Sequence, residues 1–141
     1  MVIDRTGSVV VIELKRDRLP REALAQAIDY AADIATWSLD KLGEVCASYC
    51  GETLEDVLSN AFPDIDLEGV TINGAQRIAL VGFALDPALE RMIEWLSEAY
   101  GVAINAVVLK YIRTANGAEI LTRSAVISEE VRQMILMPGK F

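Results

Sequence analysis

The sequence predicts an α/β fold with a mixed central sheet flanked by helices. Three features indicate it: apolar runs typical of buried strands, apolar residues at helical spacing between those runs, and turn-forming residues at their boundaries. Strands that alternate with helices in this way are connected by right-handed crossovers. The chain has 141 residues, so we expect one domain that spans 1–141.

The first expected element is a hairpin whose second strand is buried. Residues 9–15 begin with four consecutive apolar β-forming side chains. Residues 4–8 precede them and form a polar turn, in which Gly7 supplies a left-handed conformation. The strand ends before Pro20, which suits the first turn of the following helix.

The later elements follow from apolar spacing, helix caps and turn residues. Ser38, Thr53 and Asp86 are expected helix caps, and an Asn-Gly pair indicates the last hairpin. An acidic loop lacks the ligand spacing of an EF-hand, so we expect it to be solvated. In order, we expect helices over 21–37, 39–50 and 54–62, the acidic loop over 63–74, a strand over 77–84, a helix over 87–100, strands over 102–113 and 118–126, and a short helix and tail over 129–137.

Glu13 and Lys15 are unusual residues for a buried strand. They lie two positions apart, so both side chains point to the same face of the sheet. An unpaired charge there is costly, so each side chain needs a partner. One suitable environment is a divalent cation beside a phosphodiester, where the carboxylate binds Mg²⁺ or Mn²⁺ and the ammonium steadies the attacking water. The alternative is a solvent-facing ion pair on an edge strand.

The residues that follow Lys15 favour the first interpretation. A short basic loop leads into the next helix, on which Gln26 and Tyr30 lie four residues apart and share one face. Ile-Glu-Leu-Lys followed by Gln-x-x-x-Tyr resembles the PD-(D/E)XK nuclease superfamily, and within it the RecB-like and mismatch-endonuclease-like branch. The motif-bearing part covers roughly residues 1–37 of the chain.

The resemblance implies a restriction-endonuclease-like core and an endonuclease, a hydrolase that uses Mg²⁺ or Mn²⁺ to act on nucleic acid, DNA in preference to RNA. In that role Glu13 would bind the metal ion, Lys15 would orient water, and Gln26 and Tyr30 would position the scissile strand. Three arginines of the basic loop would bind nucleic acid, and a merely solvated loop is the alternative. They are Arg16, Arg18 and Arg21.

The superfamily also needs an acid on the strand before Glu13, and Asp4 is the only upstream candidate. A two-residue turn would pair Asp4 with Val9 and place Asp4 on the face of Glu13 but roughly 13 Å away. Carboxylates that share one cation, bound at about 2–2.6 Å, cannot be so far apart. We therefore expect Asp4 to be a turn residue and this chain to cleave poorly. Either the acid lies upstream of Met1 in an N-terminally trimmed domain, or the fold persists without the full metal site.

The second functional hypothesis is a catalytically silent α/β module that binds nucleic acid or protein as a homodimer. A short first strand would expose a sheet edge flanked by Val2, Val9 and Val11, and a symmetric partner is a common cover for such an edge. The net charge of −8 argues against broad, sequence-independent binding of nucleic acid, but it leaves room for a local basic patch.

Composition excludes several other classes of protein. The chain has no histidine, so Ser-His-Asp and Cys-His catalysis are excluded. Cys46 and Cys50 have no further cysteine or histidine to complete a zinc site, so we expect reduced, buried thiols in a cytoplasmic protein. No apolar run approaches the ~18 residues of a membrane helix, and nothing at the N-terminus resembles a secretion signal, so no membrane partner is expected.

Overall fold

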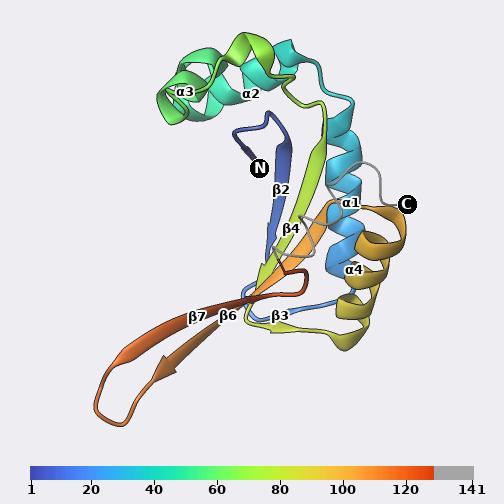
Figure 1. Cartoon of the computed structure of the whole chain (residues 1–141), viewed down its shortest axis with the longest axis vertical. Helices are drawn as coiled ribbons and strands as arrows, with labels where there is room; N and C mark the ends of the chain where they lie inside the picture. The colour runs from blue at the N-terminus through green and yellow to red at the C-terminus, as the bar shows by residue number, and fades with distance from the viewer. Residues whose placement is uncertain (129–141) are drawn as a thin grey trace. The chain divides into compact units, whose positions relative to one another are not determined.

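The computed structural model describes residues 1–128 and has the α/β architecture that the sequence predicts (Figure 1). The expected helix and tail over 129–137 lie outside the described residues. The helices are α1 (Glu22–Ala35), α2 (Leu39–Cys50), α3 (Leu54–Ala61), α4 (Pro87–Tyr100) and the short 3₁₀ helix η1 (Leu67–Gly69). The strands are β1 (Val2–Ile3), β2 (Val9–Leu14), β3 (Arg18–Leu19), β4 (Gln76–Gly82), β5 (Ala84–Leu85), β6 (Ile104–Arg113) and β7 (Glu119–Ala125).

The main sheet is mixed, with the strand order β1-β2-β4-β6-β7. β4 and β6 are parallel, whereas β1 and β7 run antiparallel to their neighbours. The N–H of Val9 donates to the carbonyl of Ala75, and the N–H of Lys15 donates to the carbonyl of Val81. The two partners are the same number of residues apart in both bonds, so β2 and β4 run parallel. Parallel neighbours need crossover connections, which α1 to α3 and α4 provide. β3 and β5 form a separate two-stranded parallel sheet.

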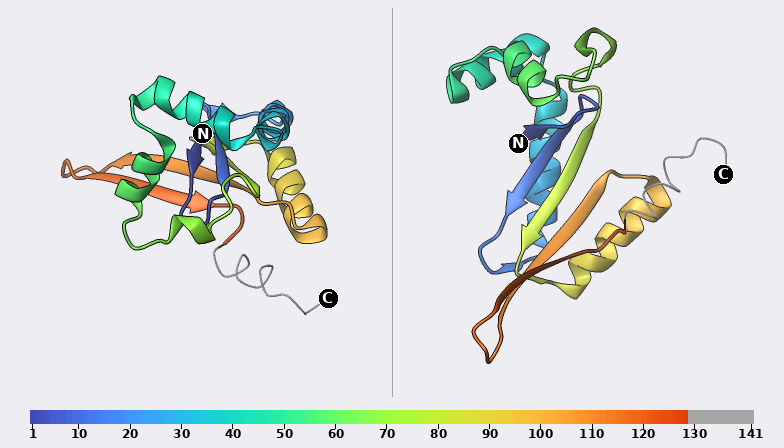
Figure 2. Two further views of the ribbon diagram at one scale, coloured as in Figure 1. Left: turned by 90° about the horizontal axis from the view of Figure 1, so that it is seen from above. Right: turned by 60° about the vertical axis from the view of Figure 1, so that its left-hand side comes forward.

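The chain divides into two compact units. The first unit consists of Met1–Val11 and Asp29–Arg77, and the second of Ile12–Ile28 and Ile78–Phe141. In the first unit, α2 and α3 lie side by side; in the second, α4 lies along β6 (Figure 2). The buried apolar side chains of the first unit include Val9, Val11, Ile34, Leu42 and Leu58, and those of the second include Leu19, Ala27, Leu80, Leu89, Ile93 and Ile104.

The helix boundaries are set by the capping residues that the sequence indicates. Ser38 and Thr53 each accept a hydrogen bond from a backbone N–H in the first turn of α2 and α3. Asp86 does the same for α4, which begins at Pro87. The helix ends before Gly101, whose φ of 64° is left-handed. The expected bounds of α2 and α4 are therefore confirmed to the residue.

The turn between β1 and β2 has the same geometry as the turn between β6 and β7. The first residue of each turn is Asp4 or Thr114, and its N–H donates to the carbonyl of the residue four positions later. Its own carbonyl accepts a hydrogen bond from the N–H of the glycine three positions later. Those glycines, Gly7 and Gly117, have φ values of 83° and 85°. The expected left-handed conformation of Gly7 is confirmed, and each loop contains three residues.

This loop length corrects the expected register of the first hairpin. Val2 pairs with Val10, one residue away from the register that a two-residue turn would give. Because side chains alternate along a strand, the shift places Asp4 on the face of the sheet opposite Val9 and Glu13. The expectation that Asp4 and Glu13 share a face is therefore wrong.

The exposed sheet edge that the sequence predicts at the first hairpin is only partly present. Val2 is exposed, but Val9 and Val11 are buried in the first unit. The buried pair lies on the inward-facing side of β2, which the alternating burial pattern of that strand defines. The exposed apolar surface of the first hairpin is therefore smaller than the sequence predicts.

Candidate functional site

Three of the four predicted catalytic residues meet in the second unit at the end of β2. The Nζ atom of Lys15 lies 2.7 Å from Oε1 of Glu13 and donates a hydrogen bond to Oε1 of Gln26 at 3.0 Å. Glu13 lies in β2, Lys15 directly follows this strand, and Gln26 lies in the first half of α1. The strand, the loop and the helix thus assemble one polar cluster, which we call the Lys15 cluster.

Backbone hydrogen bonds hold the loop that leads from β2 to α1. The N–H of Lys15 donates to the carbonyl of Val81, and the N–H of Phe83 donates to the carbonyl of Asp17. Leu19 is fully buried within the loop. These contacts connect the loop to β4 and β5 and keep Lys15 close to the first turns of α1.

Gly82 is a supporting residue that the sequence analysis treated only as part of an apolar strand. A Cβ atom at this position would lie 2.8 Å from Cγ of Leu19 and 3.3 Å from the carbonyl oxygen of Asp17. The close approach of the loop therefore requires glycine. A glycine inside a strand is the sequence signal that could have revealed this contact.

The ion pair of the Lys15 cluster is only partly accessible to solvent. The side chain of Glu13 is 14% exposed and that of Lys15 is 31% exposed. A carboxylate this sheltered needs a positive partner, which Lys15 supplies. An ammonium carries three N–H donors, and Glu13 and Gln26 accept two of them. Because the side chain of Lys15 is partly exposed, its third N–H can reach solvent.

The described residues offer one carboxylate for a metal ion at the end of β2. Glu13 is the only carboxylate in the Lys15 cluster, and within residues 1–128 no group of three or more His, Cys, Asp or Glu side chains could hold a metal ion. Mg²⁺ requires six ligands in nearly octahedral geometry and is usually bound by one or two carboxylates with several waters. The role of Glu13 as a metal ligand stays a prediction.

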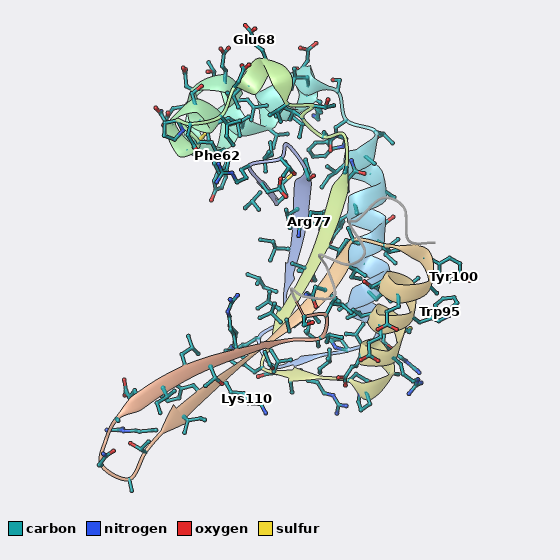
Figure 3. The ribbon with its side chains drawn as sticks, viewed as in Figure 1. Phe62, Glu68, Arg77, Trp95, Tyr100 and Lys110 are labelled. Atoms are coloured by element: carbon teal, nitrogen blue, oxygen red, sulfur yellow. The ribbon has the colours of Figure 1, made fainter. Side chains whose placement is uncertain are left out.

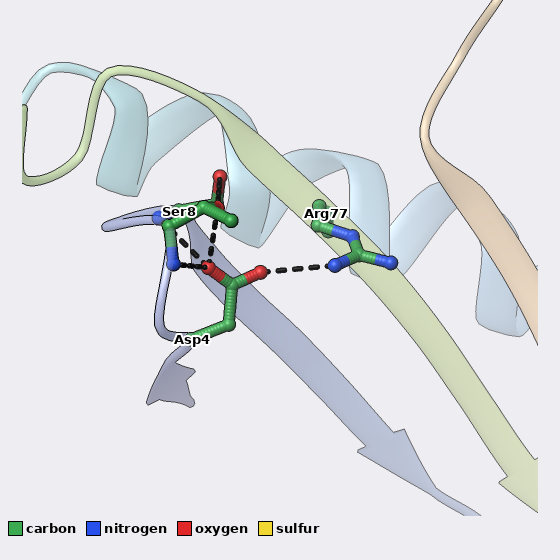
Figure 4. A network of polar contacts seen from close by, with 4 residues as sticks. Asp4, Ser8 and Arg77 are labelled. Carbon is green, nitrogen blue, oxygen red and sulfur yellow. Dashed lines mark hydrogen bonds and ion pairs between the residues drawn. The ribbon is translucent and has the colours of Figure 1, made fainter. Parts of the chain in front are cut away.

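Asp4 is engaged in the first hairpin turn, as predicted (Figure 4). Its carboxylate accepts hydrogen bonds from the backbone N–H groups of Thr6 and Ser8, from the Thr6 hydroxyl at 2.6 Å, and from Nη1 of Arg77 at 2.9 Å. Burial alone would raise the pKa of Asp4, but the hydrogen bonds from Thr6, Arg77 and Ser8 outweigh burial and lower this pKa below its ordinary value of 3.8. Arg77 was expected only as the start of a strand.

Tyr30, the fourth predicted catalytic residue, lies one helical turn after Gln26 on α1. It belongs to the first unit, and its side chain is partly exposed. The bonds described above join Lys15 to Glu13 and to Gln26, and the role of Tyr30 beside them stays a prediction.

The three arginines of the basic loop are all exposed and all belong to the second unit. Arg18 lies 3.8 Å from Asp86, and Arg21 lies 3.4 Å from Glu22. Arg16 makes no ion pair within the described part of the chain. Exposed pairs of this kind contribute little to stability, so the guanidinium groups remain accessible to an anionic ligand.

The two cysteines differ from the expected buried thiols. Cys46 is half-buried and Cys50 is exposed, while their Sγ atoms lie 3.5 Å apart. Burial, together with the hydrogen bond and charge of Cys50, raises the pKa of the Cys46 thiol. Cys50 is the last residue of α2 and is followed by the exposed Gly51. Its position at the end of the helix accounts for its exposure.

Comparison with known proteins finds no relative: no family model, no curated protein and no solved structure matches the chain. Among the described helices, none has both the length and the apolar character needed to cross a membrane.

Proposed function

We propose that this chain is a nuclease-like domain that binds the phosphodiester backbone of nucleic acid, DNA in preference to RNA, at the end of β2. The supporting observation is the Lys15 cluster, in which one N–H donor of Lys15 remains for a phosphate oxygen beside the exposed arginines of the basic loop. With one carboxylate in the cluster, the domain binds nucleic acid but cleaves it poorly.

The distribution of charge supports this proposal despite the acidic composition. The first unit contains eleven acidic and three basic residues, which gives it a net charge of −8. The second unit contains ten of each and is neutral. Because screening limits the range of charge interactions to about 8–10 Å at physiological salt, the local balance around the basic loop matters more than the total.

Each residue of the cluster has a separate part in binding. Lys15 presents an ammonium to a phosphate, and the amide oxygen of Gln26 holds this ammonium in place. Glu13 also orients Lys15, but its negative charge repels a phosphate next to it. The three arginines add bidentate donors to neighbouring phosphates. Metal-free affinity is therefore limited by Glu13.

A binding titration tests the proposed interface. We expect the triple variant R16A/R18A/R21A to bind a fluorescein-labelled DNA duplex about tenfold more weakly than the wild type and to reduce the salt slope by about 2–3, because each phosphate contact releases counterions. The control triple K41A/R91A/R113A removes the same charge elsewhere and should change the affinity by less than about twofold. Equal losses in both triples would reject the proposed interface.

Cleavage is tested separately with Mg²⁺ and Mn²⁺ on single- and double-stranded DNA. We expect little or no cutting, since Glu13 alone holds Mg²⁺ weakly. Robust metal-dependent cleavage that Glu13→Ala abolishes would contradict this part of the proposal and would imply a second acid that supplies the missing ligand.

We also propose that the chain forms a homodimer through the hairpin of β6 and β7. Tyr111 pairs with Leu121, and Ile112 pairs with Ile120. Tyr111 and Leu121 are 57% and 67% exposed, and both isoleucines are also exposed. Because adjacent pairs point to opposite faces, both faces of this hairpin carry exposed apolar side chains. Among residues 1–128, β7 is also an edge strand, and a second copy can bind the backbone groups along such an edge.

A further inference from the structure

The first unit contains a groove that the proposed function does not use. It lies among α2, α3 and η1 and has a volume of about 510 Å³. Its apolar lining includes Leu54 at the start of α3, Leu58 in the middle of α3 and Leu67 at the start of η1. Leu58 is buried and the other two are half-buried, so the groove has a hydrophobic floor that remains open to a ligand.

Four carboxylates line the same groove. Asp40 and Glu44 lie on α2, Glu55 on α3 and Glu68 on η1. All four residues are exposed, and Figure 3 shows Glu68 pointing outward from η1. An apolar floor surrounded by carboxylates is complementary to a ligand that has an apolar face and positive charges beside it.

The acidity extends beyond the groove. Residues 39–70 contain eight acidic side chains and one basic one, Lys41. This segment therefore carries −7 of the chain's net charge of −8. Such a surface attracts cations and repels nucleic acid, so it differs in specificity from the basic loop.

Gly43 is a second, independent indication of a ligand. It lines the groove from the middle of α2, and no described atom lies within 4 Å of the position that its Cβ would occupy. Glycine destabilises a helix interior relative to alanine, and no packing within the described chain requires it at this position. A glycine here lets another backbone approach α2 closely.

We propose that this groove binds a basic amphipathic helix of a partner protein. The apolar face of that helix packs on the leucines, its backbone approaches Gly43, and its lysines or arginines pair with the surrounding carboxylates. Helix-in-groove recognition of this kind uses apolar residues at helical spacing. A second copy is a poor occupant, because each described helix carries more acidic than basic residues.

The probe for this proposal is a labelled 14-residue peptide of leucine and lysine arranged as an amphipathic helix. A scrambled peptide of the same composition controls for charge alone, and a leucine–glutamate version controls for apolar contact alone. We expect micromolar binding of the first peptide, at least about tenfold weaker binding of both controls, and a loss of affinity as salt is raised.

Two sets of variants locate the binding site. E44Q/E55Q/E68Q should weaken binding of the leucine–lysine peptide at least about tenfold, while the matched triple E90Q/E94Q/E98Q on α4 should change it by less than about twofold. Gly43→Ala should raise the melting temperature yet weaken binding about fivefold or more, which a purely structural glycine would not do.

Several results would overturn the proposal. They are a lack of binding by the leucine–lysine peptide, equal binding of the scrambled peptide, or an affinity that the groove triple and Gly43→Ala leave unchanged. A change in oligomeric mass caused by the groove triple would instead identify a second copy as the occupant. DNA affinity should be unaffected by these variants, so the proposed nucleic-acid interface is tested independently.

Discussion

Lys15 has a structural part as well as its proposed part in binding. It is the positive partner of Glu13, whose side chain is largely sheltered from solvent. A sheltered carboxylate that loses its partner is left uncompensated, whereas removal of both charges is much less costly. Stability and the proposed binding of a phosphate would therefore depend on the same ammonium group.

A double-mutant cycle measures that coupling. Lys15→Met should lower the free energy of unfolding by about 1–3 kcal/mol, less than for a fully buried pair because Lys15 is partly exposed. Adding Glu13→Gln to Lys15→Met should recover most of this loss. Urea denaturation of the two single variants and the double variant gives the interaction energy, and strictly additive losses would show that the pair is not coupled.

Asp4 gives the first hairpin a pH dependence of known sign. Its pKa is lower in the folded state than its ordinary value of 3.8, so the stabilisation is complete above about pH 4. It is lost as the pH falls through the lower, folded-state pKa. Asp4→Asn should cost about 1 kcal/mol at pH 7 and reduce the loss of stability on acidification.

Asp64→Asn provides the matched control for Asp4. Asp64 pairs with Arg5 at 2.9 Å, but its side chain is 70% exposed, so its removal should change stability very little. Thermal melts at pH 7, 4 and 3 compare the two variants. An equal loss of stability in Asp64→Asn would show that the network around Asp4 has no special role.

At the scale of elements, local signals explain which predictions are confirmed. α2 and α4 have the expected bounds because Ser38, Asp86 and Gly101 satisfy backbone groups at helix ends, and such residues can be recognised in the sequence. The strand register was not predictable from apolar alternation alone. It depends on the hydrogen bonds of Asp4, which favour a three-residue loop.

The candidate site, like the fold, was predictable only where local sequence signals exist. Alternation along β2 and helical spacing on α1 correctly indicate that Lys15 has Glu13 and Gln26 as neighbours. The contribution of Gly82 was not predicted, because it depends on a loop that is distant in sequence. A glycine inside a strand signals a close approach, but a single sequence does not tell which distant segment makes that approach.

Two glycines should respond oppositely to the same substitution. Gly82→Ala places a methyl group against the buried Leu19, so we expect a loss of about 1–3 kcal/mol and weaker DNA binding through displacement of the basic loop. Gly43→Ala meets open space in a helix and should gain about 0.5–1 kcal/mol. Urea denaturation of both variants checks these signs, and a tolerated Gly82→Ala would disprove the tight contact.

At the scale of the whole molecule, charge separates the two proposed binding activities. The first unit is strongly acidic and carries the groove, whereas the second is neutral overall and carries the basic loop. Each surface attracts a ligand of opposite charge, and both interactions weaken as salt is raised. The chain therefore presents two surfaces that a single net charge does not describe.

The proposed homodimer is tested by light scattering at micromolar concentration. We expect a mass near twice the 15.4 kDa of one chain, falling to that of one chain in Leu121→Lys, because a charge in the apolar hairpin surface opposes association. Tyr49→Lys is the control, since Tyr49 is 93% exposed on α2 and lies outside the hairpin. A monomeric wild type would reject the dimer.

A metal-free titration of labelled DNA with three proteins tests whether the end of β2 binds a phosphodiester backbone. Relative to the wild type, R16A/R18A/R21A should bind about tenfold more weakly, because it lacks three phosphate contacts. Glu13→Gln should bind about threefold or more tightly, because it no longer repels a phosphate beside Lys15. Opposite changes in affinity are the predicted result, and unchanged affinity in both variants would contradict the account.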